Sequence, residues 1–194
     1  ANLLISYLRE NNLYFSKAIN IIIDAESELI PHKKTAYGGD KINDSDFIFL
    51  KSYGTICVNA YDNETGKYGV LTNAHVAESN TMMYHDGNIL QGSKLGKATK
   101  RQHSGTIDVA FVPFESQDNW EVTTHARMEE DVYNNIKLGS RELIIQGAPV
   151  RRLGQTTGNT TGKLLSTNYT CRISYDGILT VITNTLQYST NSDG

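Results

Sequence analysis

Short runs of apolar, β-branched and aromatic residues recur along the chain from Tyr37 onward, and turn residues separate them. Two of the separators are Asp62-Asn-Glu-Thr-Gly66 and Asp176-Gly177. Such spacing is typical of all-β barrels and sandwiches. With 194 residues, the chain fits one large all-β domain or two small halves that share a cleft. The predicted strands span residues 54–60, 68–73, 109–114, 142–146, 162–166 and 178–184.

Residues 1–36 differ in character from the rest of the chain. The stretch 29–36 is polar and basic and contains Pro31, and Tyr37-Gly-Gly-Asp40 is a turn signal after which the pattern changes. We therefore interpret residues 1–36 as an appended segment. One helix is predicted, over the acidic and polar residues 127–136, as a linker between two β halves.

Composition excludes several partners. The net charge of −3 gives no reason to expect nucleic acid or an anionic membrane surface as a partner. No apolar run reaches the roughly 18 residues of a membrane-spanning helix. The first residues lack a basic leader and a long apolar region. We expect either a cytosolic protein or one whose signal peptide has been removed.

His75 is the first candidate catalytic residue. It follows the apolar pair Val70-Leu71 and three small residues, so it is expected at the rim of a sheet. A histidine there can act as a general base, because imidazole changes charge near neutral pH and a carboxylate can hold its second nitrogen. A histidine with only a structural role gives the same pattern.

Asp108 is the second candidate, because it opens the apolar run 109–112. A carboxylate at the start of a buried strand is costly unless hydrogen-bond donors surround it. Asp108 is either a turn residue or the group that fixes the tautomer of His75 and stabilises its charged form. Further on, Arg152-Leu-Gly-Gln-Thr-Thr-Gly-Asn-Thr-Thr-Gly162 predicts a tight β-hairpin.

In this order, the stretches 69–76, 108–112 and 152–162 closely resemble the chymotrypsin-like serine peptidases, and within them the streptogrisin and α-lytic protease branch. Tyr37-Gly-Gly-Asp40 resembles the start of their mature chains. The resemblance implies an all-β fold of two β-barrel halves with a cleft between them. The halves span residues 37–127 and 128–194, and the second is incomplete at the C-terminal end of this chain.

The same resemblance implies a serine endopeptidase that works through an acyl-enzyme, with His75 as general base and Asp108 as its orienting group. The nucleophile of these peptidases lies in Gly-Asp-Ser-Gly, which does not occur in this chain. If Gly194 is the first residue of that string, its N–H belongs to the oxyanion hole and the serine is the second residue beyond it. Ser192, which precedes Asp-Gly, is the rival nucleophile.

Partners and location follow from the resemblance as well. It implies a secreted enzyme whose signal peptide is gone, a protein or peptide substrate, and neither cofactor nor metal. Residues 1–36 are then the tail of a pro-region that is cut near Ala36 and binds the mature enzyme, or an extension packed permanently on the barrel. Two other functions stay open: an inactive pseudo-peptidase or binding module of the same fold, and a β-sandwich adhesion domain.

Cysteines and the other histidines suggest no further site. Cys57 and Cys171 lack metal-ligand spacing and are expected to be unpaired and half-buried, although a disulfide between them stays possible. His85 beside Asp86 suggests a metal, but no third ligand lies at useful spacing in the sequence. We expect surface positions for His32, His85, His103 and His125.

Overall fold

The computed structural model describes residues 33–44, 52–86, 93–129, 132–137, 139, 140, 142, 144–175 and 178–190. By its internal contacts the chain divides into two units, residues 1–32 and residues 33–194, and all described residues belong to the second. The expected surface residue His32 and the candidates Ser192 and Gly194 lie outside the described residues.

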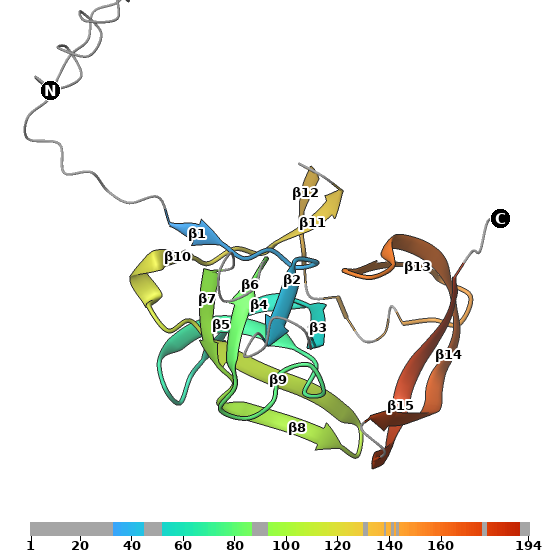
Figure 1. Ribbon diagram of the computed structural model, residues 1–194. Coiled ribbons are helices and arrows are strands. Elements are labelled where there is room, and N and C mark those ends of the chain that lie inside the picture. Colours follow the sequence, from blue (N-terminus) through green and yellow to red (C-terminus); the bar gives the residue numbers. More distant parts are fainter. Residues whose placement is uncertain are drawn as a thin grey trace, which may run out of the picture. The chain divides into compact units, whose positions relative to one another are not determined.

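The regular elements of the described residues are strands, apart from one 3₁₀ turn, η1 (Gln117–Asn119) (Figure 1). This confirms the all-β prediction. In the same part of the chain, no helix is long and apolar enough to cross a membrane. The strands are β1 (Lys34–Thr35), β2 (Lys41–Asp44), β3 (Ser52–Thr55), β4 (Val58–Asp62), β5 (Lys67–Thr72), β6 (Met82–His85), β7 (Ser93–Lys97), β8 (Lys100–Ser104), β9 (Ile107–Pro113), β10 (Trp120–Glu121), β11 (His125–Glu129), β12 (Val132–Asn135), β13 (Pro149–Gly154), β14 (Gly158–Tyr175) and β15 (Ile178–Thr190).

Two four-stranded antiparallel sheets form the first half, in the orders β3-β2-β6-β7 and β4-β5-β9-β8. Two further backbone hydrogen bonds connect the sheets: Cys57 N–H donates to Leu71 O at 2.8 Å, and Glu115 N–H donates to Leu95 O at 2.5 Å. Each sheet turns one apolar face to the other, and the enclosed side chains form the core of this half.

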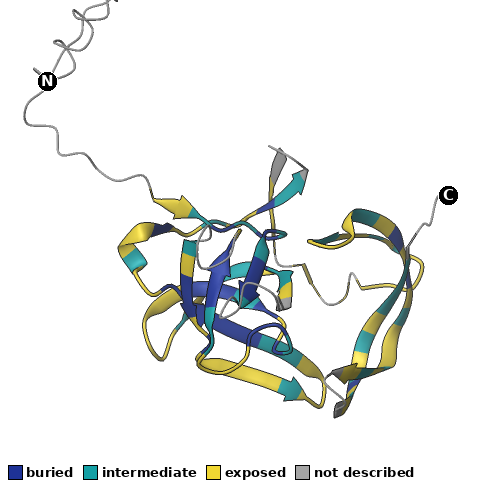
Figure 2. Cartoon of the chain, viewed as in Figure 1, coloured by how far each residue is buried: buried dark blue, intermediate teal, exposed yellow. Residues whose placement is uncertain are grey.

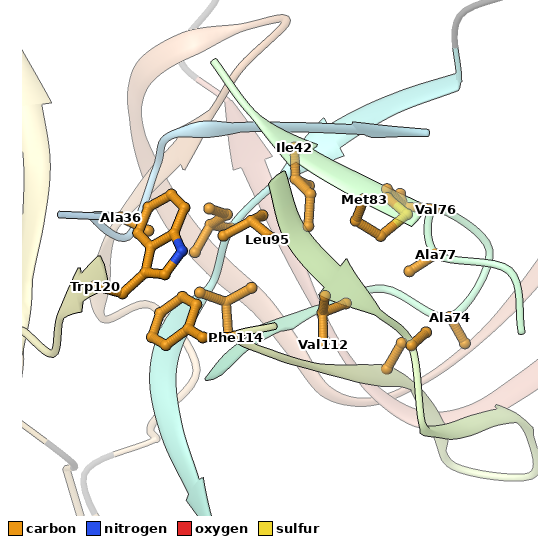
Figure 3. Close-up of a cluster of buried hydrophobic side chains, with 14 residues drawn as sticks. Ala36, Ile42, Ala74, Val76, Ala77, Met83, Leu95, Val112, Phe114 and Trp120 are labelled. Atoms are coloured by element: carbon orange, nitrogen blue, oxygen red, sulfur yellow. The ribbon is translucent and has the colours of Figure 1, made fainter. Parts of the chain in front are cut away.

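The core is a single cluster of buried apolar side chains from both sheets (Figure 3). At one end the rings of Phe114 and Trp120 stack with their centroids 5.1 Å apart. At the other end lie Ala74, Val76 and Ala77, which belong to the turn that carries His75. Burial of this turn fixes the position of the candidate histidine relative to the sheets. The cluster comprises Ala36, Ile42, Ile56, Val70, Ala74, Val76, Ala77, Met83, Leu95, Ala98, Ala110, Val112, Phe114 and Trp120.

The second half contains the antiparallel sheet β13-β14-β15, in which β14 and β15 form a long two-stranded ribbon. Its contact with the first half includes a bridge between Gly105 and Ile182 and a hydrogen bond from Thr183 N–H to Gly105 O at 2.9 Å. Among the described side chains of this half, Leu164 and Ile182 are the buried apolar ones. Figure 2 shows how much more of the ribbon is exposed than of the core strands.

Two sequence predictions are wrong. The described residues of the range 127–136 form no helix: residues 127–129 lie in β11 and residues 132–135 in β12, which pair as antiparallel strands, and Arg127 N–H donates to Gly38 O at 2.8 Å. The expected strand over 142–146 is absent among its described residues, which run into a turn at Gln146-Gly147. The predicted strand 54–60 is interrupted at Ile56-Cys57, whose N–H groups donate to Asp40 O and Leu71 O.

Residues 33–36, the last part of the expected appended segment, pack with the described unit. β1 pairs in parallel with β10, with Lys34 opposite Trp120. Ala36 is fully buried in the core cluster, and its carbonyl accepts a hydrogen bond of 2.6 Å from Asn59 Nδ2. The backbone next to the expected cleavage site is therefore part of the folded structure.

Candidate active site

His75 lies in a tight turn directly after β5. The turn is closed by hydrogen bonds from Val76 N–H and Ala77 N–H to Asn73 O, at 3.1 and 3.2 Å. Val76 fills space above Gly54 in β3, where any Cβ would overlap the Val76 methyl groups. Small residues on one strand and a buried valine after the histidine thus hold the imidazole at the sheet rim.

Asp108 is the second residue of β9, the neighbour of β5 in the sheet. The antiparallel register pairs Thr72 with Ala110, so the end of β5 lies beside the start of β9. This register brings His75 and Asp108 together although 33 positions separate them in the sequence.

The carboxylate of Asp108 is surrounded by donors from the His75 turn. Its Oδ2 lies 2.5 Å from His75 Nδ1 and 3.2 Å from Asn73 Nδ2, and its Oδ1 accepts from Ala74 N–H at 2.8 Å and from His75 N–H at 3.3 Å. The Asp108 side chain is 8% exposed and the His75 side chain 25%. The donors offset the cost of burying the carboxylate, and the imidazole stays within reach of solvent.

This arrangement fixes the orientation of the His75 ring. When Nδ1–H donates to Asp108, the lone pair of the neutral imidazole is on Nε2, and an imidazolium is stabilised by the adjacent carboxylate. Sequence reasoning identified both residues but not Asn73, which donates to the Asp108 carboxylate and to its backbone carbonyl. The only sequence signal for that role is an amide side chain just after a strand.

Two cavities open beside Asn73. One, of about 400 Å³, is lined by Asn73, Thr106, Asp108 and ribbon residues that include Tyr169, Cys171 and Ile182. The other, of about 590 Å³, is lined by residues of the first half, of the segment 128–136 and of the segment 151–154. Asn73 lines both cavities and Asp108 lines the first, so the carboxylate that contacts His75 borders a space between the first half and the ribbon.

A second His–Asp pair is buried within the first half. His85 is buried, contrary to the prediction of a surface position, because its Nε2 bonds the fully buried Asp40 Oδ2 at 2.8 Å. Arg127 Nε lies 3.0 Å from Asp40 Oδ1, and Tyr37 N–H donates to Asp40 Oδ2. Oxygen atoms of Asp40 and Asp86 lie close enough to the His85 ring to act with it as metal ligands, which the sequence spacing did not reveal.

The predicted exposure of the remaining histidines and of the two cysteines is confirmed for some of these residues and not for others. His125 is exposed, as expected, whereas His103 is only half-buried rather than fully at the surface. Both cysteines are free, with Cys171 half-buried and Cys57 exposed. Protein atoms around the Cys57 sulfur still desolvate it and raise the pKa of its thiol. A thiol of raised pKa is a weaker nucleophile at neutral pH.

Comparisons with known proteins place the fold. No family model and no curated protein matches the sequence. Among solved structures, protease A of Thermobifida fusca is 18% identical with a TM-score of 0.56, over 83% of this chain and 74% of that chain. A glutamic acid-specific serine protease is 16% identical with a TM-score of 0.58, over 79% and 72%. Nocardiopsis protease is 20% identical with a TM-score of 0.57, over 80% and 72%.

These neighbours are proteases of the chymotrypsin and streptogrisin fold, so the predicted resemblance and fold class are confirmed. At identities of 16–20%, the likeness shows the fold and does not transfer residue roles. The β-sandwich alternative is wrong, because the chain has the chymotrypsin-like architecture of two β halves.

Proposed function

We propose that this protein is a serine endopeptidase. The observation that carries the proposal is the 2.5 Å contact between His75 Nδ1 and Asp108 Oδ2, at adjacent strand ends of a chymotrypsin-like fold. A buried, donor-saturated carboxylate behind a partly exposed imidazole is what a general base needs.

In the proposed reaction, His75 takes the proton of the attacking serine and passes it to the leaving amine. Asp108 fixes the His75 tautomer and stabilises the imidazolium that forms. The serine is expected at the second position beyond Gly194, and the Gly194 N–H is expected to bind the oxyanion. Each such donor typically lowers the barrier by about 3 kcal/mol.

We propose peptides or proteins as substrates, because the structural neighbours are proteases. The same likeness supports a secreted protein. Residues 33–36 pack with the described unit, so a pro-region cut near Ala36 requires that this packing opens first. Neither a metal nor a cofactor takes part in the proposed hydrolysis.

The full-length protein tests the proposal. It should hydrolyse a fluorescently labelled protein, and a sulfonyl fluoride should block the hydrolysis by modifying one serine. His75→Ala should remove both activity and modification, whereas His125→Ala, at an exposed histidine, should keep both. A folded wild-type protein that neither cleaves nor reacts would instead be a pseudo-peptidase or binding module.

A further inference from the structure

A third titratable residue lies beside the His75–Asp108 pair. His103 on β8 stands directly opposite Asp108 on β9 in the antiparallel register. Cross-strand partners project their side chains from the same face of a sheet, and the rings of His103 and His75 have centroids 6.0 Å apart. The turn after β5, strand β8 and strand β9 therefore each contribute one side chain to the same small cluster.

The three side chains offer a metal-ligand set. One ring nitrogen from each histidine and one carboxylate oxygen of Asp108 lie within 4.8 Å of one another. His103 Nε2 is buried and, within the described part of the chain, has no hydrogen-bond partner. A ring nitrogen that no hydrogen bond occupies can accept a metal ion without breaking a contact.

We propose that His75, His103 and Asp108 bind a transition-metal ion of the Zn²⁺ class and that the bound ion inhibits the enzyme. Two imidazoles and one carboxylate are a common three-residue zinc set that leaves one position for water. A tetrahedral ion with bonds of about 2.0–2.2 Å needs ligand atoms roughly 3.4 Å apart. Binding therefore requires side-chain rotations that move His75 Nδ1 and Asp108 Oδ2 apart from their 2.5 Å contact and bring the His103 nitrogen to a similar distance from both.

Inhibition, which rests on the proposed function, follows from the tautomer. When the ion takes the lone pair of His75 Nδ1, the imidazole proton moves from Nδ1 to Nε2. The ring stays neutral and no electron is transferred, but Nε2 is now a donor and cannot accept the serine proton. The hydrogen bond from Nδ1–H to Asp108 Oδ2 is lost at the same time.

Because the ion must replace an existing hydrogen bond of Asp108, we expect it to bind reversibly and to dissociate readily. Asp108 Oδ1 keeps its donors from Ala74 and His75 N–H groups, whereas Oδ2 must give up His75 Nδ1 to accept a cation. Arg101, two positions before His103, donates to Ala74 O and not to Asp108. The ion thus competes with a strong hydrogen bond, and no described arginine forms a hydrogen bond or ion pair with the Asp108 carboxylate.

A guanidinium does contact the second cluster of possible metal ligands, which consists of Asp40, His85 and Asp86. Arg127 Nε lies 3.0 Å from Asp40 Oδ1, and Arg127 Nη2 lies 3.9 Å from Asp86 Oδ2. The Arg127 guanidinium already lies against both carboxylates there, and its positive charge weakens their attraction for a divalent cation. We expect metal ions to bind at His103 and not at His85.

Metal binding can be measured without any substrate. Titration of the full-length protein with Co²⁺ should produce the intense visible absorption of four-coordinate cobalt, and Zn²⁺ should displace it. In His103→Ala the affinity should fall at least about tenfold, since even residues that only support a ligand often contribute that much. The matched control His125→Ala should bind as the wild type does. Equal affinity in His103→Ala and the wild type would overturn the site.

A measurement on the wild type avoids dependence on folding of the variant. In an NMR titration with Zn²⁺, the ring-nitrogen signals of His75 and His103 should shift; a shift confined to His85 would overturn the assignment. Zn²⁺ should also inhibit hydrolysis by wild type and His125→Ala at concentrations that leave His103→Ala active. Co²⁺ binding without any hydrolysis would reject the proposed function and leave the metal site standing; hydrolysis without binding would do the reverse.

Discussion

Gly69 lies against the backbone of Val112 so closely that a Cβ on Gly69 would overlap the Val112 carbonyl oxygen and stand 2.6 Å from Pro113 Cα. Gly69 is in β5 and Val112 in β9, the two strands whose neighbouring ends carry His75 and Asp108. The close approach of these backbones therefore contributes to the geometry of the candidate active site, although neither residue touches it.

Gly69→Ala should destabilise the protein by about 1–3 kcal/mol, because the added methyl group meets backbone that cannot move aside cheaply. Urea unfolding measures the change. Gly139→Ala is the matched control: a Cβ there meets nothing within 4 Å, so its effect should stay within about 0.5 kcal/mol. Equal stability of the two variants would contradict the close approach.

His75→Ala should reduce kcat/KM by several orders of magnitude, since members of a catalytic triad act as a unit. The thermal unfolding midpoint should change little, because the Asp108 carboxylate keeps its donors from Asn73 Nδ2 and from the backbone N–H groups of residues 74 and 75. Turnover near the wild-type value would show that His75 is not the base.

Asp108→Asn should cost about 10⁴-fold in kcat, as the equivalent change does in the trypsin triad, because an amide favours the wrong tautomer of the histidine. Ala74 N–H and His75 N–H can still donate to the amide oxygen, so the fold should survive. Kinetics combined with circular dichroism of the variant separates loss of catalysis from loss of structure.

Asp40→Ala should destabilise the protein by about 3 kcal/mol, because two buried donors, Tyr37 N–H and the His85 ring, lose their shared acceptor. Asp62→Ala, at a more accessible carboxylate with a lysine partner, is the comparison and should cost less. Chemical denaturation of both variants measures the difference; a reversed order would contradict the role of Asp40.

The pKa of Asp62 is lowered to about 2, first by its hydrogen bond from Lys100 and then by that from Thr65. A carboxyl of lowered pKa stabilises the folded state above its unfolded pKa, and this contribution is lost as the pH falls towards 2. NMR titration of the Asp62 carboxyl should show the low pKa, and Lys100→Met should raise it. An unchanged pKa in Lys100→Met would exclude the lysine as its cause.

The paired positions of His75 and Asp108 can be inferred from sequence because both occur at the ends of apolar strands. The β8 strand cannot, because Lys-Arg-Gln-His-Ser has no apolar alternation and is held by its register with β9. For that reason the sequence predicts a surface position for His103. Its proximity to Asp108 depends on pairing, which the local pattern does not encode.

The helix expected over 127–136 is wrong for a related reason. Its acidic and polar composition suits an exposed helix, but backbone pairing of Gly38 with His125 and Arg127 selects an extended chain. Asp40, His85 and Arg127 likewise meet from three distant segments, so their buried charge network has no signature in the sequence. Tertiary partners outweigh local propensity at these places.

The burial of Ala36 bears on the timing of any pro-region cut. While β1 is paired with β10 and Ala36 lies in the core, the bond after Ala36 cannot enter the active site of a protease, which must surround the chain that it cuts. Cleavage there must wait for local unfolding, so its rate follows the free energy of opening this edge. If such a cut occurs, the stability of the short β1–β10 pair limits its rate more than the sequence preference of the cutting protease does.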